Sequence, residues 1–315
     1  MKILVTVPFT VEQKNMLQSA SEEQEVLFME SNEVTEEIIV GVDIIIGNLS
    51  QELIKKAANL KWLQLNSAGA DAYCVPGVLK EDTILTNASG AYDISVSEAM
   101  VAGTFGLFKK LYTYYDNQKA CLWQDEGAVQ SAYGACIVIL GLGNIGLSYA
   151  RKMKAMGSYI IGVKRHASAP VEGVDEIYTM NDLNECLKKA DLVVSILPGT
   201  PETYKMMGKE QFAAMKKSAY FMNFGRGNSV DEDALYEALE TGEIAGAMLD
   251  VTEIEPLPEE NKLWKAKNLY IMPHVAGGFH IPVTLENIAS LSAENLKRYL
   301  RGEALKNVID RTRGY

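Results

Sequence analysis

Short runs of apolar residues alternate along the chain with stretches in which apolar residues recur at helical spacing. In the first part of the chain, helical spacing is found in VEQKNMLQSA (11–20) and SQELIKKAANL (50–60). The runs typical of β-strands there are 2–9, 25–30, 43–47, 61–69 and 83–89. Alternation of strand and helix predicts a parallel sheet with helices on both faces.

A second alternation begins near Ala135, with an apolar run at 135–141 that is typical of a strand buried on both faces. Between the later strands, 230–242 reads as a helix with Asp231 near its N-cap and Gly242 at its C-cap. The remaining strand candidates are 159–163, 191–197, 219–224, 245–251 and 268–272. Six strands are the number in a complete dinucleotide-binding sheet.

Two longer helical patterns lie outside these alternations. One runs from about Ile94 to Lys119, and the other, at 283–302, is amphipathic and ends at Gly302. Because the first alternation lacks a last layer, we expect the terminal helix to return and cover it. The expected domains are therefore a discontinuous one, 1–95 with 284–315, and an inserted one, 96–283.

Composition narrows the class of protein. A chain of 315 residues is typical of two domains, and 48% hydrophobic residues are enough for large cores. The net charge of −11 disfavours nucleic acid and anionic membranes as partners. No apolar run approaches the ~20 residues of a spanning helix, and the N-terminus does not read as a signal peptide.

Cysteines and histidines are few. The cysteines form no CxxC pair and have no histidine at metal-ligand spacing; they are Cys74, Cys121, Cys136 and Cys186. We therefore expect no metal site and a reduced, cytoplasmic protein. With only three histidines in the chain, candidates for a general acid or base are limited.

A glycine motif, Gly141-Leu-Gly143-Asn-Ile-Gly146, follows the strand at 135–141 and opens a helix. The first glycine permits a tight turn, the second lets backbone approach a pyrophosphate, and the third lets the helix lie close to the sheet. We expect a dinucleotide site here that includes Asn144 and Ile145; a purely structural glycine turn is the alternative.

The end of the next strand bears on which nicotinamide cofactor is used. An NAD enzyme usually places Asp or Glu there to bind the ribose 2′-hydroxyl. This chain has Lys164, Arg165 and His166 at that place, and the first carboxylate after the strand is Glu172. Since a guanidinium binds a 2′-phosphate that a carboxylate would repel, we expect NADP, with NAD as the alternative cofactor. A solvated basic turn is the bland interpretation.

Three further residues follow successive strands of the second alternation: Arg226, Glu255 and His274. Ligands of an open α/β sheet bind at such strand ends. Each residue alone has an ordinary explanation, as a surface cation, a loop carboxylate or a histidine in a turn. Their joint occurrence favours an active site.

With these residues the sequence resembles the D-2-hydroxyacid dehydrogenase family, which includes glyoxylate/hydroxypyruvate reductases and phosphoglycerate dehydrogenases. The resemblance covers nearly the whole chain. It rests on NSAGAD (66–71), SGAYDISVSEA (89–99), GLGNIG (141–146), SILPGTPET (195–203), NFGRG (223–227), VDEDALYEAL (230–239), GAMLDV (246–251), EPLP (255–258) and LWKAKNLYIMPHVAGG (263–278). It implies an α/β protein of two Rossmann-like domains, a flavodoxin-like substrate domain and a doubly wound NAD(P)-binding domain.

The resemblance also implies roles for the three strand-end residues. Arg226 would bind the substrate carboxylate and 2-oxo oxygen, since its planar fork suits such oxygens. His274 would protonate that oxygen as hydride reaches C2, and would take the proton back in oxidation. Glu255 would hydrogen-bond the histidine ring, orient it and favour its protonated form. The formate dehydrogenase branch, which carries Gln beside its histidine, is excluded.

The resemblance also implies contacts with the cofactor, with the substrate and with a second copy of the chain. The nicotinamide end would be bound by Asp250, and further cofactor contacts would be Leu197, Pro198 and Thr203. The substrate would meet backbone N–H groups of Ala68, Gly69 and Ala70, and Tyr92. The family forms homodimers through its cofactor domains, and the apolar pattern at 94–119 fits such a contact.

The substrate itself stays open among glyoxylate, hydroxypyruvate and bulkier 2-oxo acids. Ala99-Met100 stands where relatives often have His or Tyr, and GGFHIP (277–282) departs from the usual segment, so Phe279 and His280 are candidate pocket residues. A cofactor-sensing, corepressor-like binding protein is the alternative function. A phosphoglycerate dehydrogenase is a third interpretation, which an acidic chain without a regulatory C-terminal domain supports little.

Overall fold

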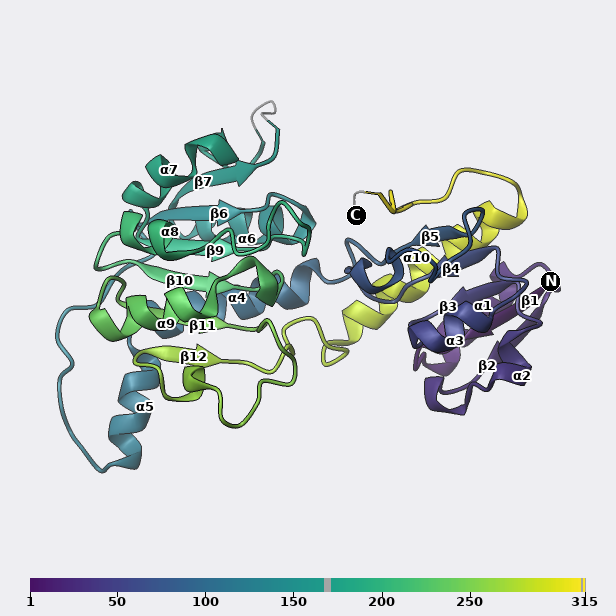
Figure 1. Cartoon of the computed structure of the whole chain (residues 1–315), viewed down its shortest axis with the longest axis horizontal. Coiled ribbons are helices and arrows are strands. Elements are labelled where there is room, and N and C mark those ends of the chain that lie inside the picture. The colour runs from purple at the N-terminus through teal and green to yellow at the C-terminus, as the bar shows by residue number, and fades with distance from the viewer. Residues whose placement is uncertain (167–170, 313, 315) are drawn as a thin grey trace. The chain divides into compact units, whose positions relative to one another are not determined.

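The computed structural model describes residues 1–166, 171–312 and 314, and its chain divides into two compact units. Unit 1 comprises Met1–Tyr92 and Phe279–Tyr315, and unit 2 comprises Asp93–Gly278 (Figure 1). The chain thus passes between units after Tyr92 and after Gly278, rather than after residues 95 and 283 as expected from the sequence. Each unit is described by itself below.

Unit 1 contains a five-stranded, wholly parallel sheet in the order β2-β1-β3-β4-β5. The strands are β1 (Lys2–Val5), β2 (Glu25–Phe28), β3 (Ile44–Ile46), β4 (Trp62–Gln64) and β5 (Ile84–Thr86). This is the 2-1-3-4-5 order of flavodoxin-like folds, so the predicted fold of this part is confirmed. All five predicted strands are present but shorter.

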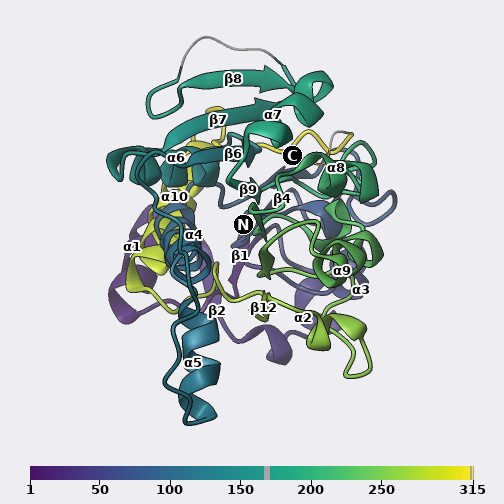
Figure 2. The ribbon, with the colours of Figure 1, turned by 90° about the vertical axis from the view of Figure 1, so that its left-hand side faces the viewer.

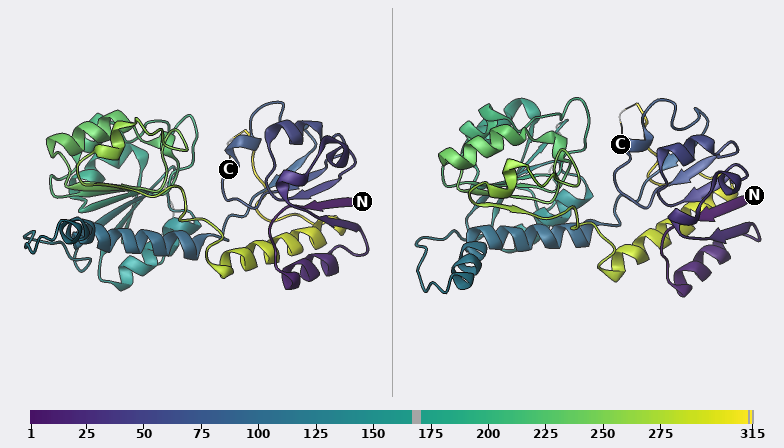
Figure 3. Two further views of the ribbon diagram at one scale, coloured as in Figure 1. Left: turned by 90° about the horizontal axis from the view of Figure 1, so that it is seen from below. Right: turned by 60° about the horizontal axis from the view of Figure 1, so that its bottom comes forward.

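Helices cover both faces of this sheet. They are α1 (Val11–Ala20), α2 (Glu36–Ile39), α3 (Gln51–Lys56) and α10 (Pro282–Leu300), with short 3₁₀ turns at Ser31–Glu33 and Asp71–Tyr73. Figure 3 shows α1 and α10 together on one face. Buried Asn295 of α10 donates a hydrogen bond from Nδ2 to Gln64 Oε1 of β4 (2.9 Å), and Tyr299 stacks on Trp62. The terminal helix therefore completes the core of unit 1.

Unit 2 contains a seven-stranded parallel sheet in the order β12-β11-β10-β9-β6-β7-β8. The strands are β6 (Cys136–Leu140), β7 (Tyr159–Lys164), β8 (Glu176–Thr179), β9 (Leu192–Ser195), β10 (Tyr220–Asn223), β11 (Gly246–Leu249) and β12 (Leu269–Ile271). With β6 counted as the first strand, the order from β8 to β11 is the doubly wound 3-2-1-4-5-6 order, and β12 extends the sheet by one strand. The predicted fold class is confirmed, although the predicted count of six strands missed the edge strand β8.

The helices of unit 2 are α4 (Asp93–Phe108), α5 (Leu111–Lys119), α6 (Asn144–Ala155), α7 (Leu183–Lys189), α8 (Lys209–Ala214) and α9 (Glu232–Thr241). Three 3₁₀ turns add Met180–Asp182, Gly227–Ser229 and Lys262–Lys265. Figure 2 shows α4 and α6 on one face of the sheet, and α8 and α9 on the other. Among the described residues, no helix has both the length and the apolar character to cross a membrane.

The single helix predicted for 94–119 is in fact two. Lys110 adopts a left-handed conformation (φ 53°), which ends the first helix and starts α5 in a new direction. The apolar face of α4 is buried within unit 2, whereas α5 stands out from the sheet (Figure 1). The caps predicted for the helix at 230–242 are confirmed: Asp231 accepts from two backbone N–H groups, and Gly242 is left-handed (φ 70°).

Candidate active site at the carboxyl ends of the strands

Arg226, Glu255 and His274 follow β10, β11 and β12, which are neighbours in the sheet of unit 2. Because parallel strands bring their carboxyl ends to one edge, the loops that bear these residues meet there. A Cβ added to Gly227 would lie 1.9 Å from the backbone carbon of Thr252. Only glycine at this position therefore lets the loop after β10, which bears Arg226 (the arginine loop), lie directly against the loop after β11, which bears Glu255 (the glutamate loop).

The histidine and the glutamate form a hydrogen-bonded pair. His274 Nδ1 lies 2.7 Å from Glu255 Oε2, and Glu255 Oε1 accepts the backbone N–H of Thr252 at 3.1 Å. A carboxylate only accepts hydrogen bonds, so Nδ1 carries the hydrogen and Nε2 is left for a substrate. Both side chains are partly exposed, 48% for His274 and 37% for Glu255. Such an exposed pair adds little stability; its effect is to orient the ring.

The backbone at His274 is held in a conformation that few residues adopt. Its φ of 51° lies in the left-handed region, which costs on the order of 1–3 kcal/mol outside glycine. The carbonyl of Asp250 accepts the His274 N–H (2.8 Å), and Asp250 Oδ1 accepts those of Val275 (3.0 Å) and Ala276 (3.2 Å). Burial raises the pKa of Asp250, and the two backbone donors oppose that rise. Asp250 thus anchors the histidine turn.

Arg226 lies between two glycines that pack tightly. A Cβ at Gly225 would lie 2.5 Å from the Leu197 carbonyl oxygen, so the loop also presses against the loop after β9. Arg226 Nη1 donates to the Gly225 carbonyl at 2.9 Å, and its side chain is half-buried. A planar guanidinium at this edge is suited to a carboxylate or phosphate.

The glycine loop after β6 has the geometry expected of a dinucleotide site. Gly141 has a φ of 99°, and a Cβ there would lie 2.7 Å from the Ile196 carbonyl oxygen; one at Gly146 would lie 2.3 Å from the Gly141 carbonyl oxygen. A Cβ at Gly143 would meet nothing within 4 Å. The loop therefore leaves room at Gly143, where α6 begins with Asn144 and Ile145. Helix N-termini bind phosphate, so these residues fit a dinucleotide.

The basic residues predicted to contact the cofactor stand at the end of the next strand. Lys164 ends β7, and Arg165 and His166 follow it on the surface. Arg165 Nη2 lies 3.8 Å from Glu202 Oε2, an ion pair between exposed side chains. Glu202 belongs to the loop after β9, which connects the basic turn to that part of the predicted cofactor site.

The loop after β9 is closed by one threonine. Thr203 Oγ1 donates to the Pro198 carbonyl (2.6 Å) and accepts the Thr200 N–H (2.9 Å). Leu197 and Thr203 are buried and Pro198 is half-buried. This loop thus lies beside the glycine loop and the arginine loop at the same edge of the sheet.

The loop predicted to bind substrate lies in unit 1, after β4. Asn87 Nδ2 donates to the Ala68 carbonyl at 2.6 Å, and the Tyr92 hydroxyl donates to the Asn66 carbonyl. Within the part of the chain that the structure describes, no group accepts from the backbone N–H groups of Ala68, Gly69 or Ala70. Backbone N–H groups without a partner can bind an anion, so these three remain candidates for the predicted substrate contact.

Tyr92 contributes to that loop through its hydrogen bond. Its side chain is buried, and burial raises the pKa of Tyr92 to about 12. Phe279 and His280, the other candidate pocket residues, are exposed at the start of the returning segment of unit 1, and Met100 is buried in α4. The sequence did not single out Asn48, which accepts the Asn66 N–H and shapes this loop.

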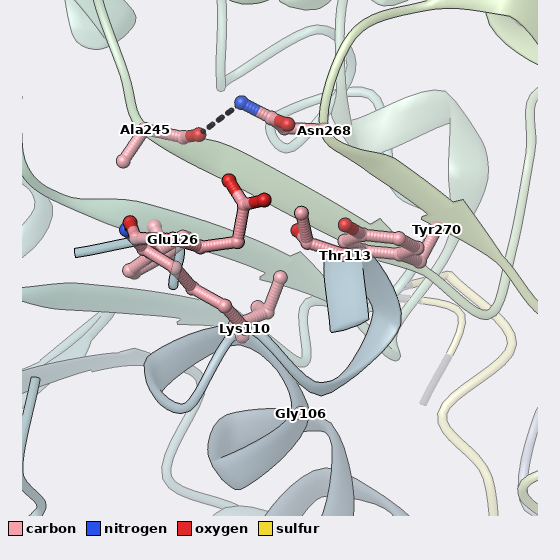
Figure 4. A pocket seen from close by; sticks show the side chains of 9 residues that line it. Gly106, Lys110, Thr113, Glu126, Ala245, Asn268 and Tyr270 are labelled. Atoms are coloured by element: carbon pink, nitrogen blue, oxygen red, sulfur yellow. Dashed lines mark hydrogen bonds between the residues drawn. The ribbon is translucent and has the colours of Figure 1, made fainter. Parts of the chain in front are cut away.

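A cavity of about 320 Å³ lies elsewhere in unit 2 (Figure 4). It is lined by Gly106, Leu107, Lys110, Thr113, Glu126, Tyr220, Ala245, Asn268 and Tyr270. Tyr220 begins β10, and Ala245 and Asn268 precede β11 and β12. The cavity is therefore at the amino ends of these strands, opposite the edge that bears Arg226 and His274.

Comparison with known proteins supports the same assignment of the fold. Residues 101–276 match the family model described as D-isomer specific 2-hydroxyacid dehydrogenase, NAD binding domain. Glyoxylate/hydroxypyruvate reductase B from Enterobacter sp. (strain 638) is 33% identical over 264 residues, 82% of this chain and 80% of that protein.

Two further proteins match nearly the whole chain. D-3-phosphoglycerate dehydrogenase from Methanocaldococcus jannaschii is 32% identical over 98% of this chain, which spans only 59% of that longer protein. The crystal structure of an NADPH-dependent glyoxylate/hydroxypyruvate reductase from Sinorhizobium meliloti, in complex with NADP and sulfate, superposes with a TM-score of 0.84 at 28% identity, covering 100% of this chain and 99% of that one. The chain belongs to the D-isomer specific 2-hydroxyacid dehydrogenase family.

Proposed function

We propose that this protein reduces small 2-oxo acids to D-2-hydroxy acids with NADPH, and that Arg226, Glu255 and His274 carry the reaction. The observation that supports this most directly is the hydrogen bond between His274 Nδ1 and Glu255 Oε2. It leaves Nε2 for a substrate at the edge of the sheet that also bears Arg226. A binding protein that merely senses the cofactor would have no need of this acid–base pair.

The roles follow from the chemistry of each group. Bound NADPH supplies a hydride to C2 of the acid. Arg226 holds the substrate carboxylate and polarises the 2-oxo oxygen through its fork of donors. His274 donates the Nε2 proton to that oxygen, and Glu255, hydrogen-bonded to Nδ1, keeps the ring oriented for this transfer. In oxidation the same atoms move in reverse.

The two units divide the work in this proposal. Unit 2 binds the dinucleotide through the glycine loop, through the loop closed by Thr203 and through the region near Asp250. Unit 1 is the substrate domain in this proposal, and the backbone N–H groups of Ala68 and Gly69, to which no described residue bonds, are its candidate contacts for a carboxylate.

NADP is the preferred cofactor in this proposal, with NAD as a weaker alternative. Lys164 and Arg165 stand where an NAD enzyme usually has a carboxylate, and the similar reductase from Sinorhizobium meliloti was crystallised with NADP. The ion pair of Arg165 with Glu202 is exposed and long, so it competes weakly with a phosphate.

We also propose that the protein is a homodimer and works in a reducing compartment, the cytoplasm. α5 and the segment after it expose large apolar side chains, namely Leu111, Tyr115, Leu122, Trp123, Val129 and Tyr133. Trp123 is fully exposed (103%), which is costly unless a second copy covers it. All four cysteines are free thiols, which supports a reducing environment.

Light scattering tests the dimer, because a dimer has twice the 34.7 kDa of one chain. The variant W123E should shift the mass toward one chain, while K209E, at an exposed lysine of α8, should leave the dimer intact. A wild-type protein with the mass of one chain would refute this part of the proposal.

The activity is tested by following NADPH oxidation with glyoxylate, hydroxypyruvate and bulkier 2-oxo acids, and repeating each assay with NADH. The panel also includes 3-phosphoglycerate in the oxidation direction, because a phosphoglycerate dehydrogenase matches 98% of the chain. Oxidation of NADPH by at least one unphosphorylated 2-oxo acid is expected. Activity with 3-phosphoglycerate alone would move the proposal to that enzyme.

A further inference from the structure

Asn223, the last residue of β10, closes the arginine loop through its side chain. It is completely buried. Its Oδ1 accepts the backbone N–H of Gly225 at 3.1 Å, and its Nδ2 donates to the carbonyl of Arg226 at 3.0 Å. The amide therefore clamps the loop, with one bond before the arginine and one at the arginine itself.

A second side-chain donor reaches the same carbonyl. Ser229 Oγ donates to the Arg226 carbonyl oxygen at 2.7 Å, and Ser229 is also completely buried. On the two sides of Arg226, Gly225 and Gly227 press against Leu197 and Thr252, which leaves the loop no room to shift. The backbone from which the guanidinium extends is thus fixed by two side chains and two close packing contacts.

Asn223 is linked to the histidine loop as well. Its backbone carbonyl accepts the N–H of Asp250 at 2.9 Å, and the carbonyl of Asp250 accepts the N–H of His274 at 2.8 Å. One buried residue therefore takes part in setting the relative position of the arginine loop and the histidine loop. Neither the glycine motif nor the charged residues at the strand ends include it.

We propose that Asn223 is a positioning residue of the reaction, which acts through Arg226 and rests on the function proposed above. The site demands an amide because one end must accept a hydrogen bond and the other must donate one. An aspartate would place two acceptors together, its second oxygen against the Arg226 carbonyl. An apolar residue would leave the Gly225 N–H buried without a partner.

The test compares N223A, N223D and S229A with wild type and R226A. The control is N295A, because Asn295 is also a fully buried asparagine whose amide joins two segments, in unit 1. For each variant, kcat and the KM values for hydroxypyruvate and for NADPH are measured together with the melting temperature. Protection of the NADPH complex against heat by oxamate, an unreactive acid with a carboxylate beside a carbonyl, reports acid binding without turnover.

N223A and N223D should lower kcat/KM for hydroxypyruvate by about ten- to hundredfold, the effect of a displacement near 1 Å. They should weaken protection by oxamate and leave the KM for NADPH unchanged. S229A, which removes one of the two side-chain donors to the Arg226 carbonyl and leaves the Ser229 backbone N–H (3.2 Å) in place, should act in the same direction but less. N295A should lower only the melting temperature.

The inference is overturned if N223A, like N295A, loses stability while the kinetic constants for the acid and the protection by oxamate stay at wild-type values. If N223A and N223D do not fold, S229A decides: an unchanged KM and kcat for hydroxypyruvate would contradict the clamp. A wild-type protein that reduces none of the 2-oxo acids would instead overturn the proposed function, and this inference with it.

Discussion

Glu255 holds His274 by one carboxylate oxygen while the other oxygen is held by the backbone: Oε2 lies 2.7 Å from His274 Nδ1, and Oε1 accepts the Thr252 N–H at 3.1 Å. The side chain at position 255 must therefore offer two acceptor oxygens, one for each of the two donors. An amide in its place satisfies only one of them. The orientation of the imidazole depends on this two-point attachment.

The variant E255Q should accordingly reduce kcat by about tenfold or more, up to the 10²–10⁴-fold that the general acid itself supplies. The KM for NADPH should stay near its wild-type value, because the glycine loop is untouched. Steady-state kinetics with hydroxypyruvate measure both constants. E253Q alters a neighbouring exposed carboxylate and serves as the control; equal losses in E253Q and E255Q would count against the specific role of Glu255.

Arg226 should not be replaceable by lysine. R226K keeps the charge but loses the planar fork, and hydrogen bonds to a charged group are worth about 1.5–3 kcal/mol, or roughly ten- to hundredfold. We expect R226K and R226A both to raise the KM for the 2-oxo acid and lower kcat. R301K, at an exposed arginine of unit 1, should be neutral. Wild-type kinetics in R226K would show that charge alone suffices.

The basic turn after β7 should determine cofactor preference. R165A should raise the KM for NADPH by about tenfold, the loss of one charge-assisted contact, and leave the KM for NADH nearly unchanged. Added salt should diminish the difference between R165A and wild type, since the contact is exposed. Parallel assays with both cofactors measure this. An equal rise for NADPH and NADH would indicate that Arg165 does not read the 2′-phosphate.

Tyr92 should contribute to stability in a pH-dependent way. Burial raises its pKa from 10.0 to about 12, so the folded protein holds the phenolic proton more tightly than the unfolded chain does. The contribution of the protonated, buried hydroxyl to the free energy of unfolding is fully present below about pH 10 and is lost as the pH rises toward 12. The free energy of unfolding should therefore fall less in Y92F than in wild type between about pH 9 and pH 11.5.

Urea unfolding at the two pH values measures the difference. Y115F is the control, because Tyr115 is exposed on α5. If Y92F loses as much stability over this interval as wild type, the buried hydroxyl does not titrate as described.

The sequence predicted the sheets well because most strands are buried on both faces. Runs such as Cys136–Leu140 have no polar interruption, and helix and loop signals separate them clearly. The edge strand Glu176–Thr179 was missed for the opposite reason. All four of its residues are partly exposed, so it has no continuous apolar run. Likewise, Lys110 turns the chain between α4 and α5 without a glycine or proline to mark the break.

The candidate site was predictable where chemistry requires a particular residue type. Charged groups after successive strands and the spacing of the glycines pointed to Arg226, His274 and Gly143. The groups that hold those residues were not predictable. Asn223 reads as a polar end to an apolar strand, and only the folded loop shows its amide bonded at both ends. Asp250 was predicted as a cofactor contact, but the two hydrogen bonds that its Oδ1 accepts from N–H groups of the histidine turn were not predictable.

The most direct test of the central claim is the reduction of hydroxypyruvate with NADPH by wild type and H274A, with the configuration of the product determined. We predict one D-glycerate formed for each NADPH oxidised by wild type. H274A should have a kcat lower by about 10²–10⁴-fold with an unchanged melting temperature, because the side chain is half exposed. Formation of L-glycerate, or a wild-type rate in H274A, would contradict the proposed mechanism.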